Sequence, residues 1–127
     1  MKLFVYGTLM MPQMVVHLGL KVPLYVQATV TGYRKISTSA VPYPLLVEDH
    51  TGVLTGAIWP NITDEAYATV RKYEGPHYIE RRVWAHDRDG AKHDCAMFVT
   101  KELFKSGWTP EHAMNYWRAA AEKAKEA

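Results

Sequence analysis

Residues 3–9 read LFVYGTL, and the fold of the chain can be reasoned outward from this stretch. It opens as a short apolar run with Phe and Val, the composition of a buried strand. Gly7 ends the run, and Pro12 suits the first turn of a helix that would stop at Gly19. The stretch therefore predicts a buried first strand followed at once by a helix of about two turns.

The next part of the chain is rich in β-branched and aromatic residues, which predicts strands over residues 22–35, 41–47 and 53–59. Gly32 interrupts the first of them and is expected to mark a β-bulge or a close approach of another backbone. Residues 49–52 have the composition of a turn and are expected to separate the other two strands. This region therefore predicts successive strands without a helix between them.

A helix is predicted over residues 63–73, because Thr63 suits an N-cap and acidic residues follow it. Gly75 and Pro76 then end that helix. Two further strands are expected at residues 78–86 and 93–100, joined by a hairpin turn at residues 87–90. A last helix is expected at residues 109–127. Strands that follow one another without regular βαβ alternation predict an α+β fold on an antiparallel or mixed sheet, with closure into a barrel left open.

The chain has 127 residues, 48% of them hydrophobic, and a net charge of 15 − 13 = +2. These values predict one soluble domain over residues 1–127 and give no reason to expect a nucleic-acid partner. No run of about 18 apolar residues is present, so no membrane span is expected. The N-terminus shows no leader-like apolar region, and the single Cys95 leaves no disulfide framework, so we expect a cytoplasmic protein.

Residues 6–9 (YGTL) are the first candidate for a binding site. A glycine at a strand end allows successive backbone N–H groups to turn inward, and such a concave set of amides binds a carboxylate or a phosphate. The helix that starts near Pro12 would add partial positive charge. An ordinary strand-to-helix turn has the same sequence pattern, and the glycine spacings of nucleotide-binding loops are absent.

Glu74 is the second candidate, because it is predicted at the C-terminal end of a helix, where the helix dipole disfavours negative charge. Aromatic and apolar neighbours, among them Tyr73 and Tyr78, would also remove water from its carboxylate. Both effects raise the pKa of a carboxyl group, which suits a general base that works near neutral pH. A solvated surface glutamate at a helix end is the other interpretation of the same pattern.

Four short motifs together resemble the gamma-glutamylcyclotransferase-like superfamily, and in particular its AIG2-like branch. They are residues 4–9 (FVYGTL), 43–44 (YP), 52–59 (GVLTGAIW) and 73–78 (YEGPHY). Their order and spacing carry the resemblance, which spans about residues 3–84 together with a final strand and helix. The resemblance implies a small mixed β-barrel flanked by helices, which agrees with the strands predicted above.

The resemblance also implies roles for individual residues. The loop of Tyr6, Gly7, Thr8 and Leu9 would bind a γ-glutamyl group through backbone amides, and Glu74 would be the acid/base residue. In the implied reaction, the α-amine of a γ-glutamyl amine or amino acid attacks its own γ-carbonyl, which yields 5-oxoproline and a free amine. This chemistry needs no metal and no organic cofactor, and the expected partner is a small γ-glutamyl compound.

One position departs from the pattern of that family. Many members carry a basic residue two positions after the tyrosine that follows the EG motif, but this chain has Glu80 there, followed by Arg81 and Arg82. The departure affects the expected contacts to substrate near this position, but it does not affect Glu74 as the expected base. Tyr43, between two prolines, and Tyr78 are expected to line the substrate site. A turn packed on the barrel rim and a core aromatic are the respective alternatives.

The remaining residues with reactive or aromatic side chains have structural interpretations. His93 and Cys95 share a strand face, but two ligands do not complete a tetrahedral site, so no metal is expected. The four tryptophans are expected to anchor packing, and an exposed one would mark a contact between two copies, so a homodimer stays open. Two other function classes stay open: a module that binds a carboxylate-bearing metabolite without converting it, and an interaction domain whose barrel has lost its site.

Overall fold

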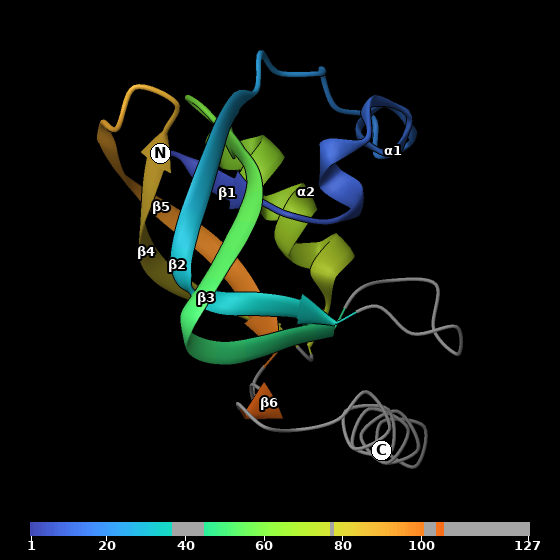
Figure 1. Ribbon diagram of the computed structural model, residues 1–127. Coiled ribbons are helices and arrows are strands. Elements are labelled where there is room, and N and C mark those ends of the chain that lie inside the picture. The colour runs from blue at the N-terminus through green and yellow to red at the C-terminus, as the bar shows by residue number, and fades with distance from the viewer. Residues whose placement is uncertain (37–44, 77, 101–103, 106–127) are drawn as a thin grey trace, which may run out of the picture.

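Five strands close into a barrel in the computed structural model, which describes residues 1–36, 45–76, 78–100 and 104–105 (Figure 1). The strands are β1 (Leu3–Val5), β2 (Val26–Ile36), β3 (Leu45–Trp59), β4 (Tyr78–Asp87), β5 (Lys92–Thr100) and a short β6 (Phe104–Lys105). The order around the barrel is β1-β5-β4-β2-β3, and β1 closes it by pairing antiparallel with β3 and parallel with β5. β6 pairs in parallel with β3. The predicted α+β fold with a mixed-sheet barrel is confirmed.

Among the described residues, three helical segments accompany the barrel: a 3₁₀ turn η1 (Thr8–Met10), α1 (Pro12–His17) and α2 (Asp64–Glu74). α1 confirms the short helix predicted after β1, whereas the 3₁₀ turn η1 between them was not predicted. Figure 1 shows α1 and α2 on the same side of the barrel, next to β1. Within the ranges given above, no helix is both long and apolar enough to cross a membrane. The helix predicted at residues 109–127 lies outside the described residues.

The core has two layers, one on each side of the barrel wall. Phe4, Val30 and Met97 belong to the cluster inside the barrel. Leu3 and Val5 belong to the cluster between the barrel and the two helices. Side chains alternate along a strand, so β1 contributes to both layers and is buried on both faces. This double burial explains why the sequence of β1 is continuously apolar.

β2 and β3 differ from the sequence prediction at two places. β2 begins at Val26, later than expected. β3 runs without interruption through residues 49–52, so the prediction of a turn that ends a strand there is wrong. The pairing register instead shifts between Thr31 and Tyr33, where Gly32 has a φ of +98° and the extra residues of β3 bulge opposite it. The register shift fits the β-bulge, one of the two alternatives predicted at Gly32, and pairing with β2 on both sides of it keeps β3 continuous.

Gly56 of β3 allows the close approach of β1. A Cβ at this position would collide with the carbonyl oxygen of Val5 and would lie 2.7 Å from Cζ of Phe4. A methyl side chain would therefore force β1 and β3 apart where they pair. Since the candidate loop at residues 6–9 begins where β1 ends, this contact also supports the strand from which that loop extends.

The limits of α2 match the local signals in the sequence. The hydroxyl of Thr63 accepts a 3.1 Å hydrogen bond from the backbone N–H of Ala66 and caps the helix. Gly75 ends the helix with a φ of +82°, and its N–H donates to the carbonyl of Arg71 at 3.1 Å. Glu74 is therefore the last residue of α2, as the sequence predicts.

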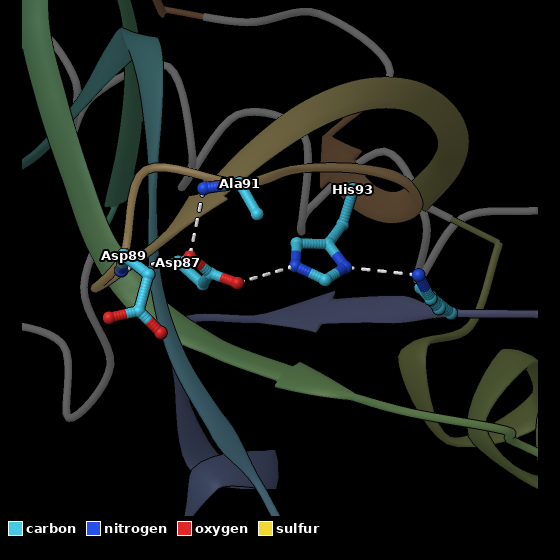
Figure 2. A network of polar contacts seen from close by, with 5 residues as sticks. Asp87, Asp89, Ala91 and His93 are labelled. Atoms are coloured by element: carbon cyan, nitrogen blue, oxygen red, sulfur yellow. Dashed lines mark hydrogen bonds and ion pairs between the residues drawn. The ribbon is translucent and has the colours of Figure 1, made fainter.

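A polar network fixes the hairpin between β4 and β5 (Figure 2). One carboxylate oxygen of Asp87 accepts hydrogen bonds from the N–H groups of Asp89 and Ala91, each at 2.9 Å. Its other oxygen lies 2.8 Å from Nε2 of His93, and Nδ1 of His93 lies 3.0 Å from Nζ of Lys2. The network ties the start of β1 to the hairpin, and the hairpin turn predicted from the sequence is confirmed.

Candidate active site

The loop after β1 presents backbone N–H groups that have no acceptor among the described residues. The carbonyl of Gly7 accepts from the N–H of Met10 at 3.0 Å, and the carbonyl of Thr8 accepts from Met11 at 2.9 Å. The N–H groups of Gly7, Thr8 and Leu9 find no acceptor within the described part of the chain. A Cβ added at Gly7 would meet no atom within 4 Å, so the space beside this glycine is open. The loop therefore has donors to offer to an anion.

Leu9 anchors this loop in the core. Its side chain is only 4% exposed and belongs to the cluster between the barrel and the helices. Its carbonyl accepts a 2.6 Å hydrogen bond from the hydroxyl of Tyr25, whose ring meets that of Trp59 edge-on. Leu9 can thus contribute only its backbone N–H to a ligand. Sequence reasoning did not single out Tyr25, since nothing near it in the chain points to Leu9.

Glu74 is half-buried at the C-terminal end of α2. Burial raises the pKa of its carboxyl group from an ordinary 4.5 to about 7. No hydrogen bond or ion pair with another described residue compensates for the lost water. A carboxyl group in this state is about half ionised near neutral pH, so it can both take and return a proton.

Two observations bring the loop and the end of α2 together. The hydroxyl of Thr8 lies 2.8 Å from the hydroxyl of Tyr73, which precedes Glu74 and lies 65 positions from Thr8 along the chain. Tyr6 is close to the same helix end: burial first, and then the neighbouring Tyr78 and Glu74, raise the pKa of Tyr6. The backbone donors and the carboxyl group therefore lie on the same side of the molecule.

Phe98 of β5 supports this region from the barrel. Its carbonyl accepts a 2.6 Å hydrogen bond from the hydroxyl of Tyr6. Its ring stacks on that of Tyr67 in α2, with the ring centroids 5.6 Å apart. One residue of the barrel wall thus holds both Tyr6 and the helix that carries Glu74. The sequence carries no signal for this role, because Phe98 reads as an ordinary core residue.

Glu80, the departure noted in the sequence, does not face the loop. Its carboxylate accepts a short hydrogen bond from the hydroxyl of Tyr67, and the guanidinium of Arg71 lies 4.9 Å from the centre of the Tyr67 ring. Glu80 therefore joins β4 to α2 on the outer face of the barrel. Side chains alternate along β4, so the next residue, Arg81, lies on the inner face. The acidic residue at this position thus serves the contact between helix and sheet.

The other residues predicted at the site have mixed outcomes. Tyr78 packs against the cluster between the barrel and the helices and lies close enough to Tyr6 to affect its pKa. Tyr78 thus packs as a core aromatic, and its place in the substrate site stays a prediction. Tyr43 lies outside the described residues. Lys35, which sequence reasoning missed, donates a 3.1 Å hydrogen bond from Nζ to the carbonyl of Tyr6.

Cys95 is buried in β5, and His93 of the same strand belongs to the polar network of the hairpin. Cys95 is a free thiol buried inside the barrel, and burial raises its pKa. Both ring nitrogens of His93 are engaged, one with Asp87 and one with Lys2. Across the residues that the structure describes, no group of three or more His, Cys, Asp or Glu side chains fits a metal ion.

The tryptophans differ in exposure. Trp59 is buried between the barrel and the helices, as expected of a packing anchor. Trp84 of β4 is 57% exposed, and Nζ of Lys92 lies 5.6 Å from the centre of its ring. Trp108 and Trp117 lie outside the described residues. An exposed tryptophan is thus present, and a homodimer stays a prediction.

The sequence model of the gamma-glutamyl cyclotransferase, AIG2-like family matches residues 3–119 of this chain. The chain belongs to this family. AIG2-like protein C of Arabidopsis thaliana is 32% identical over 81 residues, which are 64% of this chain and 47% of that protein. A Methanocaldococcus jannaschii protein whose name includes gamma-glutamylcyclotransferase is 28% identical over 100 residues, 77% of this chain and 45% of its own. The chain spans about half the length of these curated relatives.

Solved structures share the barrel. A solution structure of an Arabidopsis thaliana protein superposes with a TM-score of 0.72 at 20% identity, over 97% of this chain and 83% of that chain. A structure named gamma-glutamyl cyclotransferase superposes with a TM-score of 0.62 at 11% identity, over 80% of this chain and 66% of that chain. Identities this low show a common fold and do not transfer an activity. The family and the barrel that the resemblance implies are both confirmed.

Proposed function

We propose that this protein is a γ-glutamyl cyclotransferase that converts a γ-glutamyl amine or amino acid into 5-oxoproline and a free amine. Membership of the family supports this class of reaction. The observation that carries the proposal is the contact between Thr8 and Tyr73, because Tyr73 directly precedes Glu74, whose carboxyl group has a pKa of about 7. In this proposal Glu74 is the acid and base, and residues 6–9 bind the glutamyl group.

The first half of the reaction forms the ring. The substrate is folded so that its own α-amine faces its γ-carbonyl carbon, and ionised Glu74 takes a proton from the α-ammonium group. The freed lone pair forms the new N–C bond, while the π electrons of the carbonyl move to its oxygen. The N–H groups of residues 7–9 donate hydrogen bonds to that oxyanion.

The second half releases the amine. The electron pair on oxygen re-forms the carbonyl, the bond to the leaving nitrogen breaks, and protonated Glu74 returns a proton to that nitrogen. The α-ammonium group loses two protons in all and the leaving nitrogen gains two, so Glu74 relays both and no water is consumed. The nucleophile and electrophile belong to one molecule, which is worth up to about 7–11 kcal/mol when the folded geometry is held well.

Glu74→Gln tests the proposal, because an amide keeps the size of the side chain but does not exchange the proton. A panel of γ-glutamyl amines, amino acids and small peptides is assayed for 5-oxoproline by chromatography with mass detection. We expect kcat to fall by about 10²- to 10⁴-fold. Glu65→Gln, at an exposed glutamate in the first turn of α2, is the matched control and keeps normal turnover. Normal release of 5-oxoproline by Glu74→Gln would rule out Glu74 as the base.

Calorimetry with the same panel separates catalysis from binding. A γ-glutamyl compound that binds the wild-type protein but yields no 5-oxoproline over hours would identify a carboxylate-binding module on the same fold. The panel also identifies the leaving amine. Turnover in the presence of a chelator tests the expectation that no metal is used. Cell fractionation tests the expected cytoplasmic location, and sedimentation tests for the homodimer.

A further inference from the structure

Arg81 of β4 brings a positive charge to the inner face of the barrel. Ile79 and Val83, its neighbours on that face, pack against the cluster inside the barrel, and Arg81 pairs across to the fully buried Met97 of β5. Its side chain is partly buried, and Nη1 donates a 3.5 Å hydrogen bond to the hydroxyl of Tyr33. A guanidinium group in such a place has lost part of its hydration.

Among the residues that the structure describes, Arg81 has no carboxylate partner, unlike two nearby arginines. Arg82, the next residue but on the outer face, pairs with Asp94 at 3.0 Å. Arg34 pairs with Asp49 at 3.2 Å. In the described ranges, the recorded contact of the Arg81 side chain is the long hydrogen bond to a neutral hydroxyl, and no Asp or Glu pairs with it. Most of the five N–H donors of this guanidinium are therefore available to an anion.

Tyr33 connects this cation to the candidate site. Tyr33 and Tyr6 pack against the same inner cluster, and Tyr33 adds to the effects of burial, Tyr78 and Glu74 that raise the pKa of Tyr6. Lys35 donates to the carbonyl of Tyr6, so a second positive group lies beside the loop. This rim of the barrel therefore carries two positive groups, Arg81 and Lys35, and one carboxyl group, Glu74. Burial opposes the ionisation of Glu74, so the balance of charge favours a bound anion.

We propose that Arg81 binds the α-carboxylate of the γ-glutamyl group, an inference that rests on the proposed function. A planar guanidinium matches a carboxylate through two parallel hydrogen bonds. The α-carboxylate stays on the ring product, whereas the leaving amine must depart to solvent, so the inner face of the barrel suits the α-carboxylate. The N–H groups of residues 7–9 are then free to stabilise the oxyanion.

Arg81→Met tests the assignment with two compounds, γ-glutamyl ethylamide and its analogue whose α-carboxylate is a carboxamide. The variant should lose about 10- to 150-fold in kcat/KM with the carboxylate compound, the range for a hydrogen bond to a charged group. The analogue should be a poor substrate for the wild-type protein and no poorer for the variant. Arg82→Met, on the outer face, is the matched control and should leave both rates unchanged. Arg81→Lys should recover part of the loss.

Two kinetic outcomes would overturn the assignment. An equal loss with both compounds would show that Arg81 has a structural role. A loss confined to γ-glutamyl amino acids, whose leaving group carries a second carboxylate, would place that other carboxylate on Arg81.

Calorimetry keeps this test separate from the proposed reaction. If the wild-type protein makes no 5-oxoproline, yet Arg81→Met weakens binding of the carboxylate compound and not of its carboxamide, the binding role stands and the reaction fails. If the two compounds bind the wild-type protein equally, or neither binds, the binding role fails.

Discussion

Replacement of Glu74 by glutamine should make the folded protein more stable at pH 8 and leave its stability at pH 4.5 nearly unchanged. Burial raises the pKa of Glu74 from 4.5 to about 7, so the folded protein keeps this proton over a range in which the unfolded chain has lost it. The unfolded state then binds fewer protons, and the free energy of unfolding falls as the pH rises. The fall begins near pH 4.5 and ends above about pH 7.

The size of the effect follows from the pKa difference. The step from 4.5 to about 7 is about 2.5 units, and each unit corresponds to about 1.36 kcal/mol, which gives about 3 kcal/mol. Glu74 is half-buried, so water screens part of this cost, and about 1–3 kcal/mol is expected. At pH 8 the wild-type protein bears the cost of a buried negative charge, and the neutral glutamine does not.

Urea unfolding gives the difference in unfolding free energy between the variant and the wild-type protein at pH 4.5 and again at pH 8. The effect is the change in that difference between the two pH values. The pKa values of Asp49 and Asp87 are lowered, chiefly by hydrogen bonds from Thr51 and His93, but these groups titrate alike in both proteins and cancel. The variant should gain about 1–3 kcal/mol at pH 8 relative to its value at pH 4.5. The control Glu65→Gln should show no such gain.

A stability difference of the same size at both pH values would refute this reasoning. It would show that Glu74 ionises as easily in the folded protein as in the unfolded chain. The proposed base would then have an ordinary pKa, and burial would not account for its action near neutral pH. A gain in stability at pH 8 together with lost turnover would show instead that the ionised carboxylate is kept for catalysis at the expense of stability.

Three other measurements bear on the site and on the barrel. The pH–rate profile of kcat/KM should rise through about 7, because Glu74 must lose its proton to act as the base, and a flat profile would contradict that role. Gly7→Ala should fold normally, since its Cβ meets no atom within 4 Å, but should raise KM by filling the space beside the donors; an unchanged KM would place the substrate elsewhere. Gly56→Ala should lose about 1–3 kcal/mol by colliding with Val5, and an unchanged melting temperature would contradict that packing.

Elements with strong local signals can be predicted from the sequence. Thr63 and Gly75 set the limits of α2, because capping preferences act within a few residues. β3 shows where this approach fails. Residues 49–52 have the composition of a turn, yet pairing with β2 on both sides of Gly32 keeps them in the strand. Strand pairing depends on residues that are distant in the chain, and local composition does not report it.

The candidate site is less predictable than the fold. The direction of the pKa shift of Glu74 follows from its apolar neighbours, but nothing local in the sequence brings Thr8 to Tyr73 across 65 positions. Before the structure is known, only the resemblance to a family places the YGTL loop and Glu74 in one site. Lys35 and Arg81 escape sequence reasoning because the register of the barrel decides which strand face meets the loop.

β1 is three residues long, and its partners β3 and β5 lie far along the chain. While a ribosome makes the protein, β1 emerges well before Ala96, the residue of β5 with which Leu3 pairs. Until β5 has been made, β1 lacks its parallel partner, and the strand from which the YGTL loop extends can pair on one side only. Under the proposed function, turnover would thus report completed folding, because a nascent or partly refolded chain would lack the assembled site.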